Sequence, residues 1–306
     1  MSLLISIPHY MSIYIGIPLY TFGFLGNLIN ITVLFSKRNN PCTFLLIYAS
    51  IIDCFVLNIG LLPRIQAVGF NTDSTLMNLP WCKIRSYGLR VTSLTSIHIV
   101  SLMSIERFFV SCRTAHWRDM SNLKWIRCVA FLITFVFVFE SLPFLILTEI
   151  LRSATSISCT PMYNAIFARY ASFFGIPAFY GVIPLSIMII MSILIYYKLR
   201  TRTHLRKAQR SLTLIILVRI IIVLVSCGPY AVYFIYSAIV MLTVSGKSSE
   251  RIAIENCILG VVSTFLYVTY SPSFFIYYSI SSSYRKQVLY VLRYVYKRRR
   301  NAIQPA

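Results

Sequence analysis

The 306-residue chain is much more apolar than a soluble domain, because 58% of its residues are hydrophobic and only 12% are charged, where soluble domains carry about 25% charged residues. This composition excludes an ordinary soluble enzyme. The net charge of +21 raises nucleic-acid binding as an alternative, but the basic residues gather in short hydrophilic breaks between apolar runs, which is typical of membrane proteins. We therefore expect a membrane protein without a nucleic-acid partner.

Seven apolar runs are each long enough to cross a bilayer as a helix, which takes about 20 residues. They predict an all-α membrane protein, a seven-transmembrane helix bundle over residues 12–280. A short N-terminal segment, 1–11, precedes the bundle, and a basic tail, 281–306, follows it. The expected spans are 12–36, 42–67, 82–111, 126–150, 172–198, 211–240 and 253–280.

Lysine and arginine residues lie unequally on the two sides of these spans. Most of them follow the first, third and fifth spans or belong to the tail. Because basic loops stay in the cytoplasm, we expect the N-terminus, 1–11, to be extracellular and the C-terminus to be cytoplasmic. The residues behind this orientation include Lys37, Arg38, Arg113, Arg118, Lys198, Arg202 and Arg206.

Two polar side chains lie inside the first two spans. Asn27 follows a glycine in the first span, and Asp53 is the only carboxylate deep in either of them. Polar groups at this depth are costly unless they face the bundle interior, and a carboxylate needs a partner, a proton or a cation. Asp53 is therefore a candidate functional residue.

The third span begins with a cysteine and ends with an ionisable pair. It starts at Trp81-Cys82 and ends in Glu106-Arg107-Phe108, and at about 1.5 Å per residue the run between them can cross a bilayer. Glu106 can hold Arg107 as a neighbouring ion pair. The alternative is an arginine that only extends its side chain to the membrane edge.

These features resemble the rhodopsin-like (class A) G-protein-coupled receptors. In that family a disulfide cysteine precedes the arginine of an Asp/Glu-Arg-Tyr motif by 25 residues, which is the spacing from Cys82 to Arg107, and Phe108 takes the place of the tyrosine. The family's Gly-Asn in helix one and Leu-Ala-x-x-Asp in helix two match Asn27 and Asp53, although Ala and Ser replace the Leu and Ala.

The resemblance implies two connections to the third span. A disulfide from Cys82 to Cys159, the cysteine of the second outer loop, would pin that loop to the top of helix three. Ser96 corresponds to the family's helix-three serine at a sodium site, so Asn27, Asp53 and Ser96 are expected to form a polar cluster that binds Na⁺. A water-filled hydrogen-bond network around Asp53 is the alternative.

Several switch residues of the family are altered in the later spans. Pro229 matches the helix-six proline, whose kink is kept, but Cys227 replaces the aromatic residue that normally stands near it. Ser192 stands where a helix-five tyrosine is expected, and no glutamate lies at the base of the sixth span to pair with Arg107. The resemblance therefore implies a weaker restraint on Arg107 and a higher resting activity.

The seventh span ends in Tyr-Ser-Pro-Ser-Phe-Phe-Ile-Tyr-Tyr, where two registers compete for the family's Asn-Pro-x-x-Tyr motif. Matching the proline places Ser271 and Phe275 on the motif's Asn and Tyr. Matching Ser273 and Tyr277 keeps the family spacing to the aromatic residue that opens helix eight, Tyr284, so we favour this register and expect Ser273 in the polar core. It resembles the Asn-Phe-x-x-Tyr variant of some invertebrate peptide receptors, and the chain is similar to FMRFamide-like neuropeptide receptors of invertebrates.

Residues 284–300 form a basic stretch in which Val and Leu recur among Lys and Arg. This pattern predicts a short amphipathic helix eight that lies on the anionic inner leaflet. Membrane lipids are therefore an expected partner.

Three arginines on the ligand side of the membrane indicate the kind of ligand. Arg64 lies near the outer end of the second span, and Arg85 and Arg90 lie in the outer half of the third. Arginines at this depth are costly unless they face water, a carboxylate or a ligand, and the guanidinium fork suits a carboxylate. We expect a ligand with an anionic or acceptor group, most simply a short peptide. Pairing inside the protein, with Glu140 or Glu149, is the alternative.

Two well-known ligand classes do not fit. Leu89 stands where amine receptors carry an aspartate, and the range 253–280 contains no lysine for a retinal Schiff base. We therefore expect neither a biogenic amine nor retinal.

The resemblance implies a plasma-membrane receptor that binds an extracellular ligand and activates heterotrimeric G proteins when helix six swings about Pro229. A seven-span chemosensory receptor for a small molecule, or a channel or transporter, is the alternative, although transporter-like repeat symmetry is not evident. We expect no enzymatic activity, because Asp53 has no second aspartate and His98 has no nucleophile at membrane depth. No cofactor other than Na⁺ at Asp53 is expected.

Overall fold

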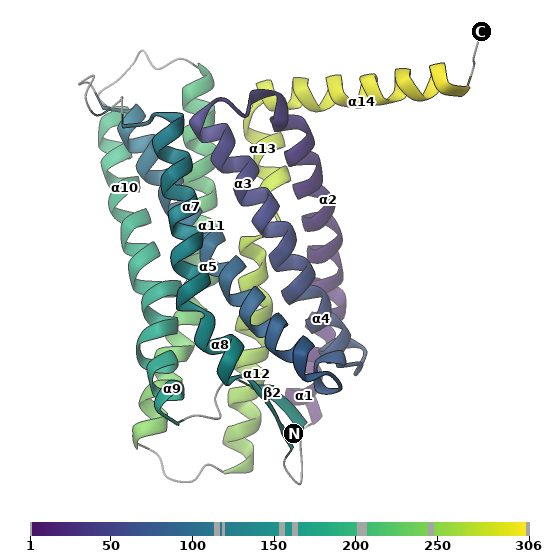
Figure 1. Ribbon diagram of the computed structural model, residues 1–306, viewed down its shortest axis with the longest axis vertical. Coiled ribbons are helices and arrows are strands. Elements are labelled where there is room, and N and C mark those ends of the chain that lie inside the picture. Colours follow the sequence, from purple (N-terminus) through teal and green to yellow (C-terminus); the bar gives the residue numbers. More distant parts are fainter. Residues whose placement is uncertain are drawn as a thin grey trace.

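Seven helices of the described residues are long and apolar enough to cross a membrane, which confirms the expected seven-transmembrane bundle (Figure 1). The computed structural model describes residues 2–112, 117, 120–152, 157–160, 165–200, 207–243 and 248–303. The spans are Ser6–Lys37, Pro41–Gly69, Leu79–Val110, Leu123–Leu147, Ile166–Lys198, Ser211–Val240 and Ser249–Thr269.

The spans consist of long helices and shorter continuations. The long helices are α2 (Ile17–Leu34), α3 (Pro41–Val56), α5 (Leu79–Val110), α7 (Leu123–Glu140), α10 (Ile183–Arg200), α11 (Lys207–Thr243) and α12 (Ser249–Leu266). The shorter helices are α1 (Ser2–Met11), α4 (Leu62–Arg64), α8 (Leu142–Leu147), α9 (Ala165–Tyr170) and α13 (Ser273–Ile280). A final helix, α14 (Ser282–Ile303), leaves the bundle sideways (Figure 1).

Asparagine side chains set the first residue of three helices. Asn40, Asn78 and Asn122 precede α3, α5 and α7, and each side chain accepts a hydrogen bond from a backbone N–H of the first turn. A proline follows within the first two positions of α3 and α5, where its missing N–H costs nothing. These local signals explain why the helices begin where the hydrophilic breaks end.

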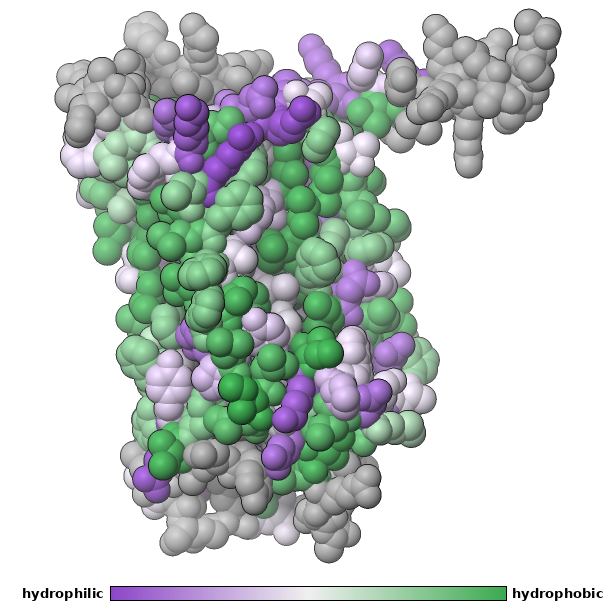
Figure 2. All heavy atoms as spheres, viewed as in Figure 1, coloured by the Kyte–Doolittle hydropathy of each residue, from purple (hydrophilic) through white to green (hydrophobic). Residues whose placement is uncertain are grey.

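The central helix of the bundle is α5. It is the most buried of the seven spans and packs against α3, α7, α10 and α11. The outer surface of the bundle is apolar, with exposed side chains such as Phe55, Phe131 and Phe135, and Figure 2 shows this apolar belt below the hydrophilic residues near α14. A bilayer suits such a belt, because its interior solvates apolar side chains.

The two ends of the bundle differ in what they hold. The disulfide end holds Cys82, Cys159 and a two-stranded antiparallel hairpin of β1 (Glu149–Arg152) and β2 (Ile157–Thr160), in which Ile150 lies opposite Cys159. The arginine end holds Glu106-Arg107 and the start of α14. The hairpin was not expected from the sequence. Of the basic residues used for the orientation, Arg113, Arg118, Arg202 and Arg206 lie outside the described residues.

The first span starts earlier than the expected residue 12. Helix begins at Ser2 and continues through a π-helical turn into α2, and α1 packs against α12. Pro8 lies on Gly260 of α12, where a Cβ would come within 2.8 Å of the proline ring. The segment 1–11 is therefore mostly part of the first helix.

The seventh span is broken rather than continuous over 253–280. Helix α12 ends at Leu266, a 3₁₀ turn covers Tyr267–Thr269, and α13 starts after Pro272. Proline removes a backbone donor and disfavours helical geometry in the residue before it. After the break, α13 packs against α2.

Candidate functional site

The predicted disulfide is present. Cys82 near the start of α5 is bonded to Cys159 of β2, across 77 residues of sequence. The bond fixes the hairpin to the central helix and confirms the expected pinning of the loop that follows α8. The hairpin consequently lies next to the disulfide end of α5.

The core of the bundle holds a buried ion pair that sequence reasoning missed. Asp53 of α3 accepts a hydrogen bond from Ser96 of α5, as expected. Its other carboxylate oxygen lies 2.5 Å from a guanidinium nitrogen of Arg219 on α11. A second nitrogen of Arg219 donates to the Tyr277 hydroxyl of α13 at 2.9 Å. Asp53 and Tyr277, like Arg219, are almost fully buried.

The residues around Asp53 do not fit the expected sodium ion. Arg219 already places a full positive charge against the carboxylate, and a second cation there would be repelled in a region of low dielectric. The signal that could have revealed this pair is Arg219 itself, the only charged residue of the sixth apolar run. An arginine inside a span needs a buried partner.

Asn27 belongs to a second polar cluster, at the contact between α2 and α13. Its amide donates to the Tyr270 carbonyl at 3.0 Å, and Ser273 donates to its side-chain oxygen at 2.6 Å. Asn30 donates to Ser273 at 3.0 Å and accepts from Tyr284 at 2.6 Å. Among the described residues Asn27 makes no hydrogen bond to Asp53, so the expected single cluster is divided in two.

This second cluster agrees with the register that aligns Ser273 and Tyr277 with the family motif. Ser273 faces the asparagines of α2, and the ring of Tyr277 contacts that of Tyr284 with centroids 5.8 Å apart. Burial raises the pKa of the Tyr284 phenol above its usual range, so the hydroxyl stays protonated and donates to Asn30. Pro272, in contrast, caps α13.

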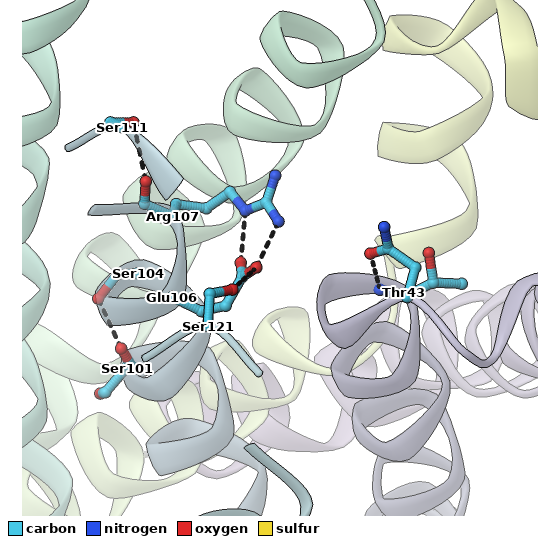
Figure 3. Close-up of polar contacts among 8 residues, drawn as sticks. Thr43, Ser101, Ser104, Glu106, Arg107, Ser111 and Ser121 are labelled. Atoms are coloured by element: carbon cyan, nitrogen blue, oxygen red, sulfur yellow. Dashed lines mark hydrogen bonds and ion pairs between the residues drawn. The ribbon is translucent and has the colours of Figure 1, made fainter. Parts of the chain in front are cut away.

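The arginine end is organised by Glu106 and Arg107, which are drawn in Figure 3. The Arg107 guanidinium donates to both Glu106 carboxylate oxygens, at 2.5 and 2.6 Å, and Ser121 donates to the same carboxylate at 3.0 Å. Within the described residues the Arg107 side chain has no other hydrogen bond or ion pair. Phe108 lies under the Lys198 ammonium of α10, 3.9 Å from its ring centroid.

Arg90 is not available to a ligand in this structure. Its guanidinium is paired with Glu140 of α7 at 2.7 Å and lies 4.1 Å from the ring centroid of Phe144. The internal pairing left open as an alternative is therefore correct for Arg90, with Glu140 as the partner. Burial explains it, because an arginine between helices needs a counter-charge.

Arg64 and Arg85 have only neutral partners. Arg64 donates to the Gly260 carbonyl at 2.9 Å and to the Thr264 hydroxyl at 3.4 Å, while Arg85 donates to the Ile59 carbonyl at 3.3 Å. In the described part of the chain no carboxylate lies within ion-pair distance of either. Both remain half-buried positive charges at the disulfide end.

A family model for the 7 transmembrane receptor (rhodopsin family) matches residues 26–277. The chain belongs to this receptor family. No curated protein sequence matches it. The match begins at Gly26, next to Asn27, and ends at Tyr277, so it includes Cys82, Arg107 and, apart from Tyr284, both polar clusters. A member of this family is a multi-pass plasma-membrane receptor, and the family is one of receptors rather than enzymes. The likeness to invertebrate neuropeptide receptors stays a prediction.

The receptor keeps the helix-six proline, but the residue near it is Cys227 instead of an aromatic residue. Pro229 lies inside the continuous helix α11. Cys227 is buried, and its sulfur lies 3.7 Å from the Thr269 hydroxyl, next to the break in the seventh span. A thiol fills less space than the aromatic residue expected there, so the contact between α11 and the seventh span is a small polar one.

Proposed function

We propose that the receptor binds an extracellular ligand with an anionic or acceptor group at its disulfide end and activates heterotrimeric G proteins at its arginine end. In this proposal the N-terminus is outside the cell. The observation that carries the ligand class is the pair of half-buried arginines, Arg64 and Arg85, whose partners are all neutral oxygens.

A negatively charged group on the ligand would stabilise these two arginines. Positive charge held at this depth is costly without a counter-ion, and in the described part of the chain both guanidinium groups donate only to neutral oxygens. A carboxylate can accept two parallel hydrogen bonds from one guanidinium. A short peptide with a free C-terminus or an acidic side chain supplies such a group. Arg90 instead positions α5 against α7 through Glu140.

The arginine end offers a place for the G protein. A cavity of about 440 Å³ lies there, lined from α2, α3, α11, α13 and α14 by residues that include Leu34, Thr43, Ile215, Tyr277 and Tyr284. An outward swing of α11 about Pro229 would enlarge this space, so that a partner protein could reach Arg107. The basic helix α14 leaves the bundle at this end (Figure 1), where anionic lipid headgroups would attract it.

Nucleotide exchange on purified G proteins, in membranes that contain the receptor, tests the proposal. Short peptides are screened as matched pairs, with a free and an amidated C-terminus. For a peptide that activates only with its carboxylate, Arg64→Gln and Arg85→Gln should each weaken potency about 10-fold or more, since a charged hydrogen bond contributes roughly 1.5–3 kcal/mol. Lys83→Gln is the matched control, because it removes a positive charge at the same end that bonds only the Ile146 carbonyl.

Three results would count against the proposal. Equal potency of the two arginine variants and the wild type, for every active peptide, would exclude these arginines as the anion site. Ion current or solute flux without any G protein would favour the channel or transporter alternative. Exchange that persists in Arg107→Ala would exclude the assigned role of the arginine end.

A further inference from the structure

The Asp53 carboxylate is occupied by a cation that the protein itself supplies. Arg219 is the only arginine in the membrane-spanning part of α11. It contacts two other helices directly and a third one through Asp53. It pairs with Asp53 of α3, which also holds Ser96 of α5, and it donates to Tyr277 of α13. The Nε of Arg219 has no partner in the described residues.

We infer that Arg219 is a built-in core cation, which takes the place of a sodium ion at Asp53 and ties α11 to α3 and α13 in the resting receptor. A bound sodium ion exchanges with the solvent, so its occupancy follows the salt concentration. A guanidinium attached to the chain stays charged at every physiological pH and is present at a fixed, high effective concentration. The core of this receptor should therefore be insensitive to sodium.

The position of Arg219 along α11 makes the same pair a tether. It lies ten residues before Pro229, on the side toward the arginine end, about 15 Å along the helix axis. A swing of that part of α11 about the proline would carry Arg219 away from Asp53. Both charges are buried, so separating them without a new partner is costly. The pair consequently favours the closed arrangement.

Thermal unfolding of the full chain in lipid nanodiscs, in NaCl and in KCl of equal ionic strength, tests the replacement of sodium. The wild type should unfold at the same temperature in both salts. Arg219→Met should lower the Tm by about 5 °C or more, and its Tm should be higher in NaCl than in KCl, because Asp53 and Ser96 are then open to sodium. Arg219→Lys should show no sodium preference, since it keeps the charge.

Arg90→Met is the matched control. It breaks another buried arginine–carboxylate pair, with Glu140, and should lower the Tm equally in both salts. A sodium-specific rise in the Tm of the wild type would overturn the inference, and so would Arg219→Met without any change in Tm. If Arg219→Met does not fold, the Asp53→Asn/Arg219→Met double variant, which lacks both charges, should fold and show no sodium preference.

The tether has a second readout, which rests on the G-protein coupling proposed above. Arg219→Met should raise ligand-free nucleotide exchange several-fold over the wild type, and Arg90→Met should not. Exchange that is unchanged in Arg219→Met, in a receptor that an identified ligand still activates, would overturn the tether. Absence of exchange in every variant with every ligand would instead contradict the coupling, while the unfolding measurements still decide the core cation.

Discussion

The arginine end and the core of the bundle both hold a buried arginine–carboxylate pair. The first pair lies within one helix, whereas the second joins two helices. Glu106 and Arg107 are neighbours on one helix, and their pair can persist wherever the other helices move. Asp53 and Arg219 are 166 residues apart and join α3 to α11. Only the core pair reports the position of α11. The resting restraint on α11 therefore lies in the core, in the tether inferred above.

The largest expected effect comes from removing the carboxylate of the core pair. Asp53→Leu leaves Arg219 buried without a counter-charge, which should lower the free energy of unfolding by about 3–5 kcal/mol. Asp53→Leu/Arg219→Met removes both charges and should recover most of that loss. Denaturation of the four receptors of this double-mutant cycle in nanodiscs measures the coupling. Additive losses would show that the two side chains do not act as a pair.

A smaller effect is expected at the arginine end. Glu106→Gln removes the charge that Arg107 faces, but Arg107 can turn toward the membrane surface and water, so the loss of stability should be about 1–2 kcal/mol. Ligand-free nucleotide exchange should rise less than in Arg219→Met. A larger rise in Glu106→Gln would reverse the comparison and place the main restraint at this end.

The smallest effect concerns Ser121, which donates one hydrogen bond to Glu106. Ser121→Ala leaves the Glu106–Arg107 pair intact, so stability should fall by about 0.5–1 kcal/mol and ligand-free exchange should stay near the wild-type value. The same denaturation assay measures it. A loss as large as that of Glu106→Gln would mean that the loop, and not the ion pair, holds Arg107.

The parts of this receptor that follow local rules could be predicted from its sequence. Apolar runs of sufficient length gave the seven spans, and a fixed spacing pointed to Cys82 and Arg107. The disulfide to Cys159 and the bond from Ser96 to Asp53 were also expected and are present. The break of the seventh span was missed although Pro272 is a local signal for it. The early start of the first span was missed because it depends on the packing of α1 against α12.

The long-range ion pairs could not be assigned from the sequence. Whether Arg90 meets Glu140 depends on the rotation of two helices. The sequence alone is therefore compatible both with a ligand contact and with internal pairing of Arg90. Arg219 was overlooked because no family motif contains it, although a lone arginine in an apolar span always needs an explanation. The sodium expectation followed from the resemblance at Asn27, Asp53 and Ser96, and it did not include the tertiary contact of Asp53 with Arg219.

The most direct test of the tether is the distance between α11 and the first span at the arginine end, measured by electron paramagnetic resonance. Spin labels on unnatural amino acids at Leu214 and Phe35, both exposed, leave the native cysteines in place. The ligand-free wild type should give a single, short distance between the two labels. Arg219→Met should show a second population with a longer distance. Identical distance distributions in the two proteins would contradict the claim that Arg219 holds α11 closed.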